Sequence, residues 1–354
     1  MYLKVVFMGT PKFSVPSLDM LIREGYEVSA VITQPDKPKG RGKKLCCPPV
    51  KEYAEKQGIY VLQPEKINTA EFISLLKKIA PDILITVAYG KILPKGVLDI
   101  PQKGCVNVHA SLLPKYRGAA PISWVIINGE TKTGITTMLT DSGMDTGDIL
   151  LKREIDVPNH ITAGELHDKL SLLGAEVLKE TLEGIKKGTI QRAPQNEAEA
   201  TYAPMMKKET GSINWERSSK HIHNLIRGTN PWPGAFTSYN GNRVKIWRSE
   251  IESQTLKDND QTIDAAVDTT VEATVEANDI IFGINDHGTM INDSVRIDFS
   301  DINPGTIIDK GKNGILVACG KGSIRILELQ FDGCRKLCAG ECWHNFEVGA
   351  KFGS

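Results

Sequence analysis

The chain has 354 residues, of which 40% are apolar and 24% charged, and its 43 acidic side chains balance its 43 lysines and arginines. This composition is ordinary for a globular protein, and the length predicts two domains. No stretch is apolar for long enough to cross a membrane and the first residues lack a signal-peptide pattern, so we expect a cytoplasmic protein without a membrane partner.

The first half of the chain alternates short apolar runs with stretches of helical spacing. Strands are predicted at residues 4–8, 28–33, 82–87, 105–106 and 133–139. Amphipathic helices are predicted at residues 13–22, 49–57, 70–80, 121–128 and 162–187. This order predicts the α/β fold class, with a Rossmann-like, mostly parallel sheet and helices on both faces. Because no Gly-x-Gly-x-x-Gly follows the first strand, we expect no dinucleotide cofactor.

Residues 34–45 form a loop rich in basic side chains, proline and glycine. Its basic residues are Lys37, Lys39, Arg41, Lys43 and Lys44. Such a segment lies at the surface, because it has few apolar side chains to bury. It is not a phosphate-binding P-loop, since it lacks the first Gly and the final Ser or Thr of that motif. Taken by itself, it is typical of a solvated loop.

Asn107 and His109 come directly after the apolar run at 105–106. In a strand their side chains point to the same side, about 7 Å apart along the chain. The carboxyl end of a parallel strand is the edge at which α/β sheets bind ligands. A histidine can move a proton near neutral pH, and an asparagine amide can donate to a developing oxyanion. The pair is therefore a candidate catalytic site, although its spacing also fits a structural role.

A second polar loop, rich in aspartate and glycine, occupies residues 141–148. The chain thus carries Asn-x-His-x-Ser-Leu-Leu-Pro at 107–114 and Met-Asp-Thr-Gly-Asp at 144–148. This combination resembles the folate-dependent formyltransferases, whose members pair these two motifs. The resemblance implies a Rossmann-like catalytic domain, a smaller OB-like β-barrel domain, 10-formyltetrahydrofolate as formyl donor and no metal.

The resemblance also implies an acceptor and a set of site residues. The formyl group would pass directly to the α-amine of initiator methionyl-tRNA through a tetrahedral oxyanion, for the initiation of translation. Asn107 would donate to the oxyanion, His109 would stabilise it or accept the amine proton, and Asp145 would pair with His109. The residues expected to line the folate site are Ala88, Tyr89, Gly90, Leu93, Ser111, Leu112, Leu113, Pro114 and Asp141. Those expected to contact tRNA are Arg41, Lys43 and Lys44.

A change in composition divides the chain. Residues 189–209 are rich in Gln, Pro, Glu, Ala and Lys, which predicts a linker between a catalytic domain at 1–188 and a second domain at 210–354. Short β segments separated by glycine-containing turns predict a small barrel in the second domain. These segments are expected at residues 235–239, 244–247, 307–308, 315–318 and 324–330.

The neutral net charge conceals an acidic insert at about 253–303. Between residues 252 and 301 there are 12 acidic and 2 basic side chains, a local charge of −10, so the rest of the chain carries +10. A basic body is compatible with a tRNA partner. The insert departs from the family, and we expect a surface excursion, ordered at 280–284 and 295–299, without a role in the site. Some basic residues of the second domain could give it a basic face or could simply be solvated: Arg227, Arg243, Lys245, Arg248, Lys321, Arg325, Arg335 and Lys336.

The seven cysteines are expected to be reduced thiols, because their number is odd and no small disulfide scaffold is evident. Cys334, Cys338 and Cys342 recur every four residues, so in a helix they would share one face and pack inward. Their spacing matches no zinc pattern, and we expect no metal site.

Several alternatives share part of this pattern. A sugar-nucleotide N-formyltransferase would use the same three catalytic residues, but the basic loop and the two-domain length speak against it. A glycinamide ribonucleotide formyltransferase needs no second domain, and a formyltetrahydrofolate hydrolase usually has a domain before the catalytic one. A non-catalytic RNA-binding protein of the same fold is disfavoured by the intact Asn107, His109 and Asp145. We expect a monomer.

Overall fold

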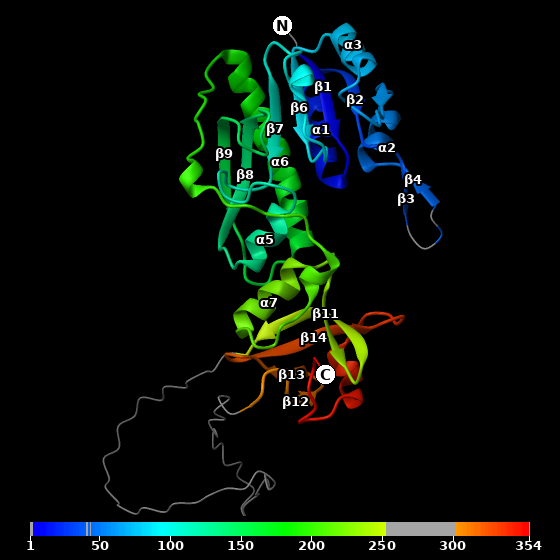
Figure 1. Cartoon of the computed structure of the whole chain (residues 1–354), viewed down its shortest axis with the longest axis vertical. Helices are drawn as coiled ribbons and strands as arrows, with labels where there is room; N and C mark the ends of the chain where they lie inside the picture. The colour runs from blue at the N-terminus through cyan, green and yellow to red at the C-terminus, as the bar shows by residue number, and fades with distance from the viewer. Residues whose placement is uncertain (1–2, 40–41, 43, 253–301, 354) are drawn as a thin grey trace, which may run out of the picture.

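The structure is a computed structural model that describes residues 3–39, 42, 44–252 and 302–353. Within these residues the larger sheet has seven strands in the order β5-β2-β1-β6-β7-β8-β9 (Figure 1). Their bounds are β1 Lys4–Gly9, β2 Glu27–Ile32, β5 Val61–Leu62, β6 Ile83–Val87, β7 Cys105–His109, β8 Lys132–Leu139 and β9 Ile149–Asp156. In this order across the sheet, β5, β2, β1, β6 and β7 pair in parallel. The strand β8 is antiparallel to β7, and β9 is antiparallel to β8. The predicted mostly parallel sheet is confirmed, and β9 is an addition to it.

Helices cover both faces of this sheet. They are α1 Val15–Arg23, α2 Pro49–Lys56, α3 Ala70–Ile79, α4 Lys95–Leu98, α5 Pro121–Ile127 and α6 Ala163–Lys187. Successive side chains of β1 point to opposite faces of the sheet and join two separate clusters of the core. Val5 and Phe7 face the side of α1 and α6, and Val6 and Met8 face the side of α3. All four side chains are fully buried.

The long helix α6 has well-defined ends. A reciprocal capping box joins Thr162 to Glu165 at its start, and Gly188 ends it with a φ of 70°, a conformation that glycine adopts without strain. Its buried leucines pack on the sheet, which brings the first turn of the helix to the carboxyl edge of the strands.

Residues 189–209, predicted as the linker, lie against the first sheet. Figure 1 shows this segment, here called the strap, passing the edge strand β9 and then crossing toward α7 (Ser219–Gly228). Ala193 makes an isolated bridge to Ile149, and Tyr202 makes one to Arg117. Two short 3-10 helices, Glu197–Glu199 and Lys208–Gly211, interrupt the strap.

The second sheet is antiparallel and smaller, as predicted. In the described part of the chain its strand order is β10-β11-β14-β13-β12, with β15 paired to β14. The elements are β10 Ala235–Tyr239, β11 Asn242–Ile251, β12 Ile307–Gly311, β13 Gly314–Ala318, β14 Ser323–Phe331, β15 Leu337–Cys338, α8 Ala339–Cys342 and a 3-10 helix at Trp343–Asn345. Tyr239, Phe346 and Phe352 form an aromatic cluster in its core. The acidic insert, with the two segments expected to be ordered in it, lies outside the described residues apart from its last two positions.

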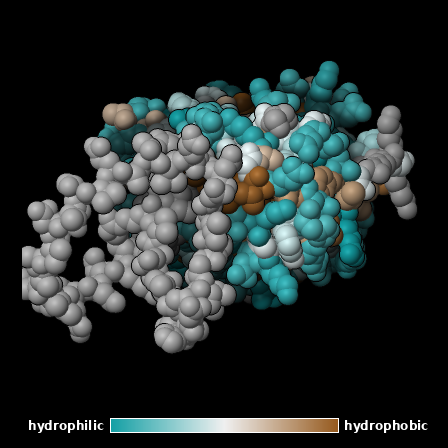
Figure 2. Space-filling model, turned by 90° about the horizontal axis from the view of Figure 1, so that it is seen from below, coloured by the Kyte–Doolittle hydropathy of each residue, from teal (hydrophilic) through white to brown (hydrophobic). Residues whose placement is uncertain are grey.

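Two arginines expected to face solvent are engaged within the protein. Arg227 on α7 is 5% exposed and donates to the carbonyls of Pro158 and Ile161, so it joins the two sheets. Arg325 forms ion pairs with Glu252 and Asp309. The prediction that Arg227 and Arg325 contribute to an exposed basic face is therefore wrong, because each guanidinium binds acceptors within the protein. The end of the molecule formed by the second domain is largely hydrophilic (Figure 2).

The predicted helical face of three cysteines is also wrong. Cys334 lies in a turn after β14, Cys338 ends β15, and Cys342 ends α8. The change from turn to strand to helix breaks the four-residue period, so Cys334 and Cys338 are exposed while Cys342 is buried. Among the residues that the structure describes, no helix combines the length and apolarity needed to cross a bilayer.

Candidate active site

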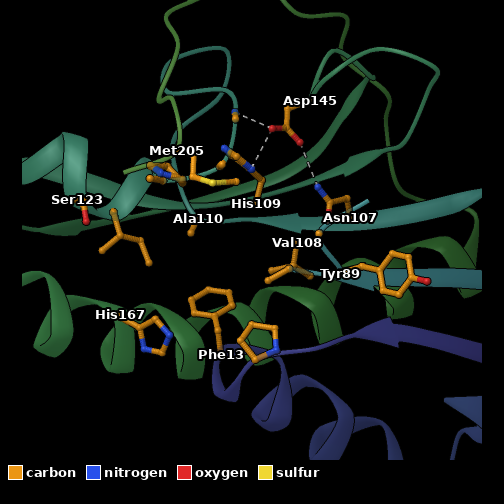
Figure 3. Close-up of a pocket in the computed structure, with 18 of the residues that line it drawn as sticks. Phe13, Tyr89, Asn107, Val108, His109, Ala110, Ser123, Asp145, His167 and Met205 are labelled. Carbon is orange, nitrogen blue, oxygen red and sulfur yellow. Dashed lines mark hydrogen bonds and ion pairs between the residues drawn. The ribbon is translucent and has the colours of Figure 1, made fainter. Parts of the chain in front are cut away.

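Three polar side chains meet at the carboxyl edge of the larger sheet. Asn107 and His109 project from the end of β7, and Asp145 reaches them from the loop between β8 and β9 (Figure 3). The Asn107 amide nitrogen lies 3.4 Å from one Asp145 carboxylate oxygen, and His109 Nδ1 lies 3.5 Å from the other. The two sequence motifs thus converge on one group of atoms.

The Asn107 amide is oriented by the neighbouring strand. Thr86 stands beside Asn107 in the β6–β7 register, and its hydroxyl donates to Asn107 Oδ1 at 3.0 Å. With the oxygen engaged, the amide N–H₂ points toward Asp145 and the cavity. Thr86 is 5% exposed and was not expected in the site. No sequence pattern marks it, because the contact depends on strand register.

His109 is held at both ring nitrogens. Its Nε2 lies 3.0 Å from the Tyr116 carbonyl oxygen, which only accepts hydrogen bonds, so Nε2 carries a proton and donates it. Nδ1 faces the Asp145 carboxylate, and the side chain is 6% exposed. This geometry fixes the plane of the imidazole and places Nδ1 next to a carboxylate.

Asp145 is fixed by its backbone surroundings. It has a φ of 56°, a left-handed conformation that aspartate tolerates better than most residues. Its Oδ2 accepts a hydrogen bond of 2.8 Å from the Gly118 amide. The start of the same loop is closed by the Asp141 carboxylate, which accepts from Gly143 N and Thr146 Oγ1. Asp141, expected at the folate site, therefore also shapes the loop that carries Asp145.

A cavity of about 1060 Å³ opens in front of these residues. Five of the expected folate-site residues line it: Ala88, Tyr89, Gly90, Leu93 and Asp141. Tyr89 is 3% exposed, and burial raises its pKa to about 12. The backbone of Gly90 has a φ of 84° at the turn after β6, which a residue with a side chain would adopt only with strain.

The other four expected folate-site residues do not line this cavity. Ser111, Leu113 and Pro114 are buried behind it, and Leu112 is half-buried. The Ser111 hydroxyl donates to the Lys115 carbonyl, and the Leu113 amide donates to Thr136. In this arrangement the four residues support the turn that leads from His109 to Gly118.

The cavity extends past Asn107, His109 and Asp145 to the junction of the two sheets. That part of its wall was not expected from sequence and includes Phe13, Ile122, Ser123, His167, Met205 and Trp232. In Figure 3, Phe13 and His167 lie across the cavity from His109, and Ser123 and Met205 lie at one end. Met205 is 72% and Trp232 55% exposed, so the outer wall offers free apolar surface. No motif predicts this set, because its members come from five separate segments.

The basic loop is a two-stranded antiparallel ribbon of β3 (Lys37–Lys39) and β4 (Lys44–Cys46). Arg41 and Lys43, expected to contact tRNA, lie outside the described residues, and Lys44 begins β4. No cluster of three or more His, Cys, Asp or Glu side chains suited to a metal ion occurs in the described ranges.

Comparison with known proteins gives the family. The formyl transferase model matches residues 3–182, and the formyl transferase C-terminal domain model matches residues 205–347. A methionyl-tRNA formyltransferase of Acetivibrio thermocellus is 53% identical over 99% of this chain and 100% of its own length. The chain belongs to the methionyl-tRNA formyltransferase family. The same enzyme of Ruminiclostridium cellulolyticum is 51% identical over 95% of this chain and 94% of its own.

The fold is shared more widely than the sequence. An N-formyltransferase from Helicobacter canadensis, solved with folinic acid and dTDP-3-aminofucose, has a TM-score of 0.61 at 19% identity and covers 92% of this chain and 99% of its own. That likeness shows the fold alone. The family expectation drawn from the two motifs is confirmed by the methionyl-tRNA formyltransferase relatives.

Proposed function

We propose that this protein transfers the formyl group of 10-formyltetrahydrofolate to the α-amine of initiator methionyl-tRNA, with Asn107, His109 and Asp145 at the reacting centre. The observation that carries the proposal is their convergence at the wall of one large cavity. Membership of the methionyl-tRNA formyltransferase family supports the donor and the acceptor class.

Each of the three side chains has a role that follows from its contacts. When the amine attacks the formyl carbon, the carbonyl oxygen becomes negative, and the Asn107 N–H₂ donates to it. His109 shares that stabilisation in its protonated form, or takes a proton from the attacking amine in its neutral form. Asp145 faces Nδ1 and orients the ring for either role. These side chains supply charge and proton transfer without a covalent enzyme intermediate.

The cavity suits two substrates that meet at these groups. Its volume of about 1060 Å³ is at the upper end of the range for sites that bind small molecules. We assign the part near Ala88–Leu93 to the folate, and the part near Met205 and Trp232 to the methionyl end of the tRNA. Apolar side chains of the second part match a thioether side chain, since both are poorly hydrated.

Transfer assays with alternative acceptors test the proposal. The protein is incubated with 10-formyltetrahydrofolate and either initiator methionyl-tRNA or an amino-sugar nucleotide. We expect formyl on the methionyl-tRNA. Asp145→Asn is expected to abolish turnover and to retain the fold, because asparagine also tolerates a positive φ but carries no charge.

Two outcomes would contradict the proposal. Formyl found on the sugar nucleotide in place of the tRNA would assign the protein to sugar modification. Normal turnover by a folded Asp145→Asn protein would remove Asp145 from the mechanism.

A further inference from the structure

The loop that carries Asp145 rests on a glutamine of the strap. Gln195 Nε2 donates to two carbonyl oxygens of that loop, those of Asp145 and Gly147, at 2.8 Å each. Composition alone assigned this residue to a linker, and none of the catalytic roles described above uses it. Its contacts fall on the backbone of the residue whose carboxylate faces His109.

The other end of the same amide is also engaged. Gln195 Oε1 accepts hydrogen bonds from Arg117 Nε and Nη2, at 3.1 and 2.8 Å. Both amide hydrogens and the amide oxygen therefore have partners, and the partners come from two different loops. A side chain with this pattern of contacts fixes the distance between the loops, since any shift of one strains bonds to the other.

Arg117 is itself rigidly placed. Its side chain is fully buried, and its guanidinium makes a bidentate pair with Glu197 of the strap, at 2.7 and 2.8 Å. Its backbone amide donates to the Thr201 carbonyl, and its carbonyl accepts from the Ala203 amide. The strap thus holds Arg117 at both backbone and side chain.

These contacts support Asp145 from two sides. The residue after Arg117, Gly118, donates to the Asp145 carboxylate, while Gln195 holds the Asp145 carbonyl. Because Asp145 has a left-handed backbone, it needs surroundings that keep it there. The carboxylate lies 3.5 Å from His109 Nδ1, a distance that a small relaxation of the loop would change.

We propose that Gln195 is a positioning residue for Asp145, and that through it the strap holds the catalytic loop in its active geometry. The proposal rests on the formyl transfer proposed above. It assigns to the strap a part in turnover in addition to its role as the connection between domains. Since Gln195 is absent from the cavity wall, its loss should affect the rate of transfer more than the binding of either substrate.

Two substitutions of Gln195 distinguish the contacts of its amide oxygen from those of its amide nitrogen. Gln195→Met removes every hydrogen bond at similar length, whereas Gln195→Glu keeps an acceptor for Arg117 and loses both donors to the loop. We expect each to lower kcat by about 10- to 100-fold with KM for folate and for tRNA within about twofold of the wild type, because a misplaced catalytic group slows the reaction without changing the binding surfaces.

Gln191→Met is the matched control. Gln191 is an exposed glutamine of the same strap and does not line the cavity. Its loss should leave kcat unchanged. If Gln195→Met does not fold, Gln195→Glu carries the test, since it retains the Arg117 contact.

The possible results separate this proposal from the one on which it rests. Failure of the wild-type protein to formylate methionyl-tRNA would contradict the proposed function. A wild type that formylates, together with folded Gln195 variants of unchanged kcat, would overturn the role of Gln195 alone. A rise in KM at constant kcat would also overturn it, since that pattern indicates lost substrate binding.

Discussion

At the scale of single residues, Asn107, His109 and Asp145, the proposed catalytic group, are closer to supporting residues than to one another. Asp145 lies 3.4 and 3.5 Å from Asn107 and His109, but 2.8 Å from the Gly118 amide. Contacts of this length tighten in many enzymes when the substrates are bound. The supporting hydrogen bonds therefore decide whether the three side chains start from a productive arrangement.

Thr86 offers the simplest test of such support. Thr86→Val keeps the shape of the side chain and removes the hydroxyl that orients Asn107. One hydrogen bond contributes about 1 kcal/mol, so we expect kcat to fall by about fivefold with the fold intact. Steady-state formylation at saturating substrates measures this change.

Thr86→Ser is the control for that substitution, because it retains the hydroxyl and loses a methyl group. It should keep nearly all of the wild-type kcat. Equal rates for the valine and wild-type proteins would show that Asn107 needs no partner on β6.

At the scale of elements, the basic ribbon β3–β4 is tied to the wall of the cavity. Lys51 donates to Asp36 and Gln63, and the bond from Gln63 is the main reason that the pKa of Asp36 is lowered, with Lys51 adding to it. Gln63 also donates to the Gln34 carbonyl, and the Gln34 side chain donates to the Tyr89 carbonyl. The base of the ribbon is thus connected by hydrogen bonds to a residue of the predicted folate site.

Arg41, in the segment between β3 and β4 that lies outside the described residues, is expected to contact the tRNA. Arg41→Ala is expected to raise KM for methionyl-tRNA by about tenfold and to leave KM for folate unchanged, because a guanidinium contributes about 1–3 kcal/mol when it contacts a base or phosphate. Formylation rates at varied tRNA concentration measure the effect.

Lys103→Ala is the matched control for charge. Lys103 is exposed and precedes β7, so it lies at the opposite end of that strand from His109. The same loss of one positive charge there should leave KM for tRNA unchanged. If both variants behave alike, general attraction explains the effect and Arg41 has no specific contact.

Features that depend on local sequence could be predicted, whereas those that depend on contacts between distant segments could not. Asn107 and Asp145 were predictable because each lies in a motif with local spacing, and the strand at 82–87 was predictable from its apolar run. Gln195 and Trp232 were not, since their roles depend on which segments the fold brings together. The prediction that three cysteines share one face of a helix was wrong for a related reason. Pairing of β15 with β14, which the sequence spacing does not reveal, breaks the four-residue period.

At the scale of the whole molecule, the two sheets are joined through α7. This helix packs against α5 of the first domain, and Arg227 binds carbonyls of the loop after β9. On the same helix, His223 donates through Nε2 to the Asn159 carbonyl, and Nδ1 contacts the Ser249 hydroxyl of β11. Residues from both sides of this junction line the cavity, so the outer wall of the cavity is formed only while the two sides remain packed together.

We expect His223 to make the junction sensitive to pH. Burial lowers its pKa below the ordinary 6.5. The hydrogen bond to the Asn159 carbonyl and the charge of Glu250 oppose the shift, and Arg227 adds to it. For a histidine with a lowered folded-state pKa, the unfolded chain binds the extra proton first, so the stabilisation is present above pH 6.5 and is lost as the pH falls below it. The folded protein should therefore lose stability between about pH 7 and about pH 5.

His223→Gln should reduce that loss, because glutamine can donate to the Asn159 carbonyl and does not titrate in this range. The measurement is urea unfolding of wild type and variant at about pH 7.5 and about pH 5.5, with the difference between the two conditions compared. His160→Gln, at an exposed histidine of the loop after β9, controls for the removal of an imidazole ring. If the wild type and the His223 variant lose stability equally on acidification, the proton is taken up elsewhere and the junction does not respond through His223.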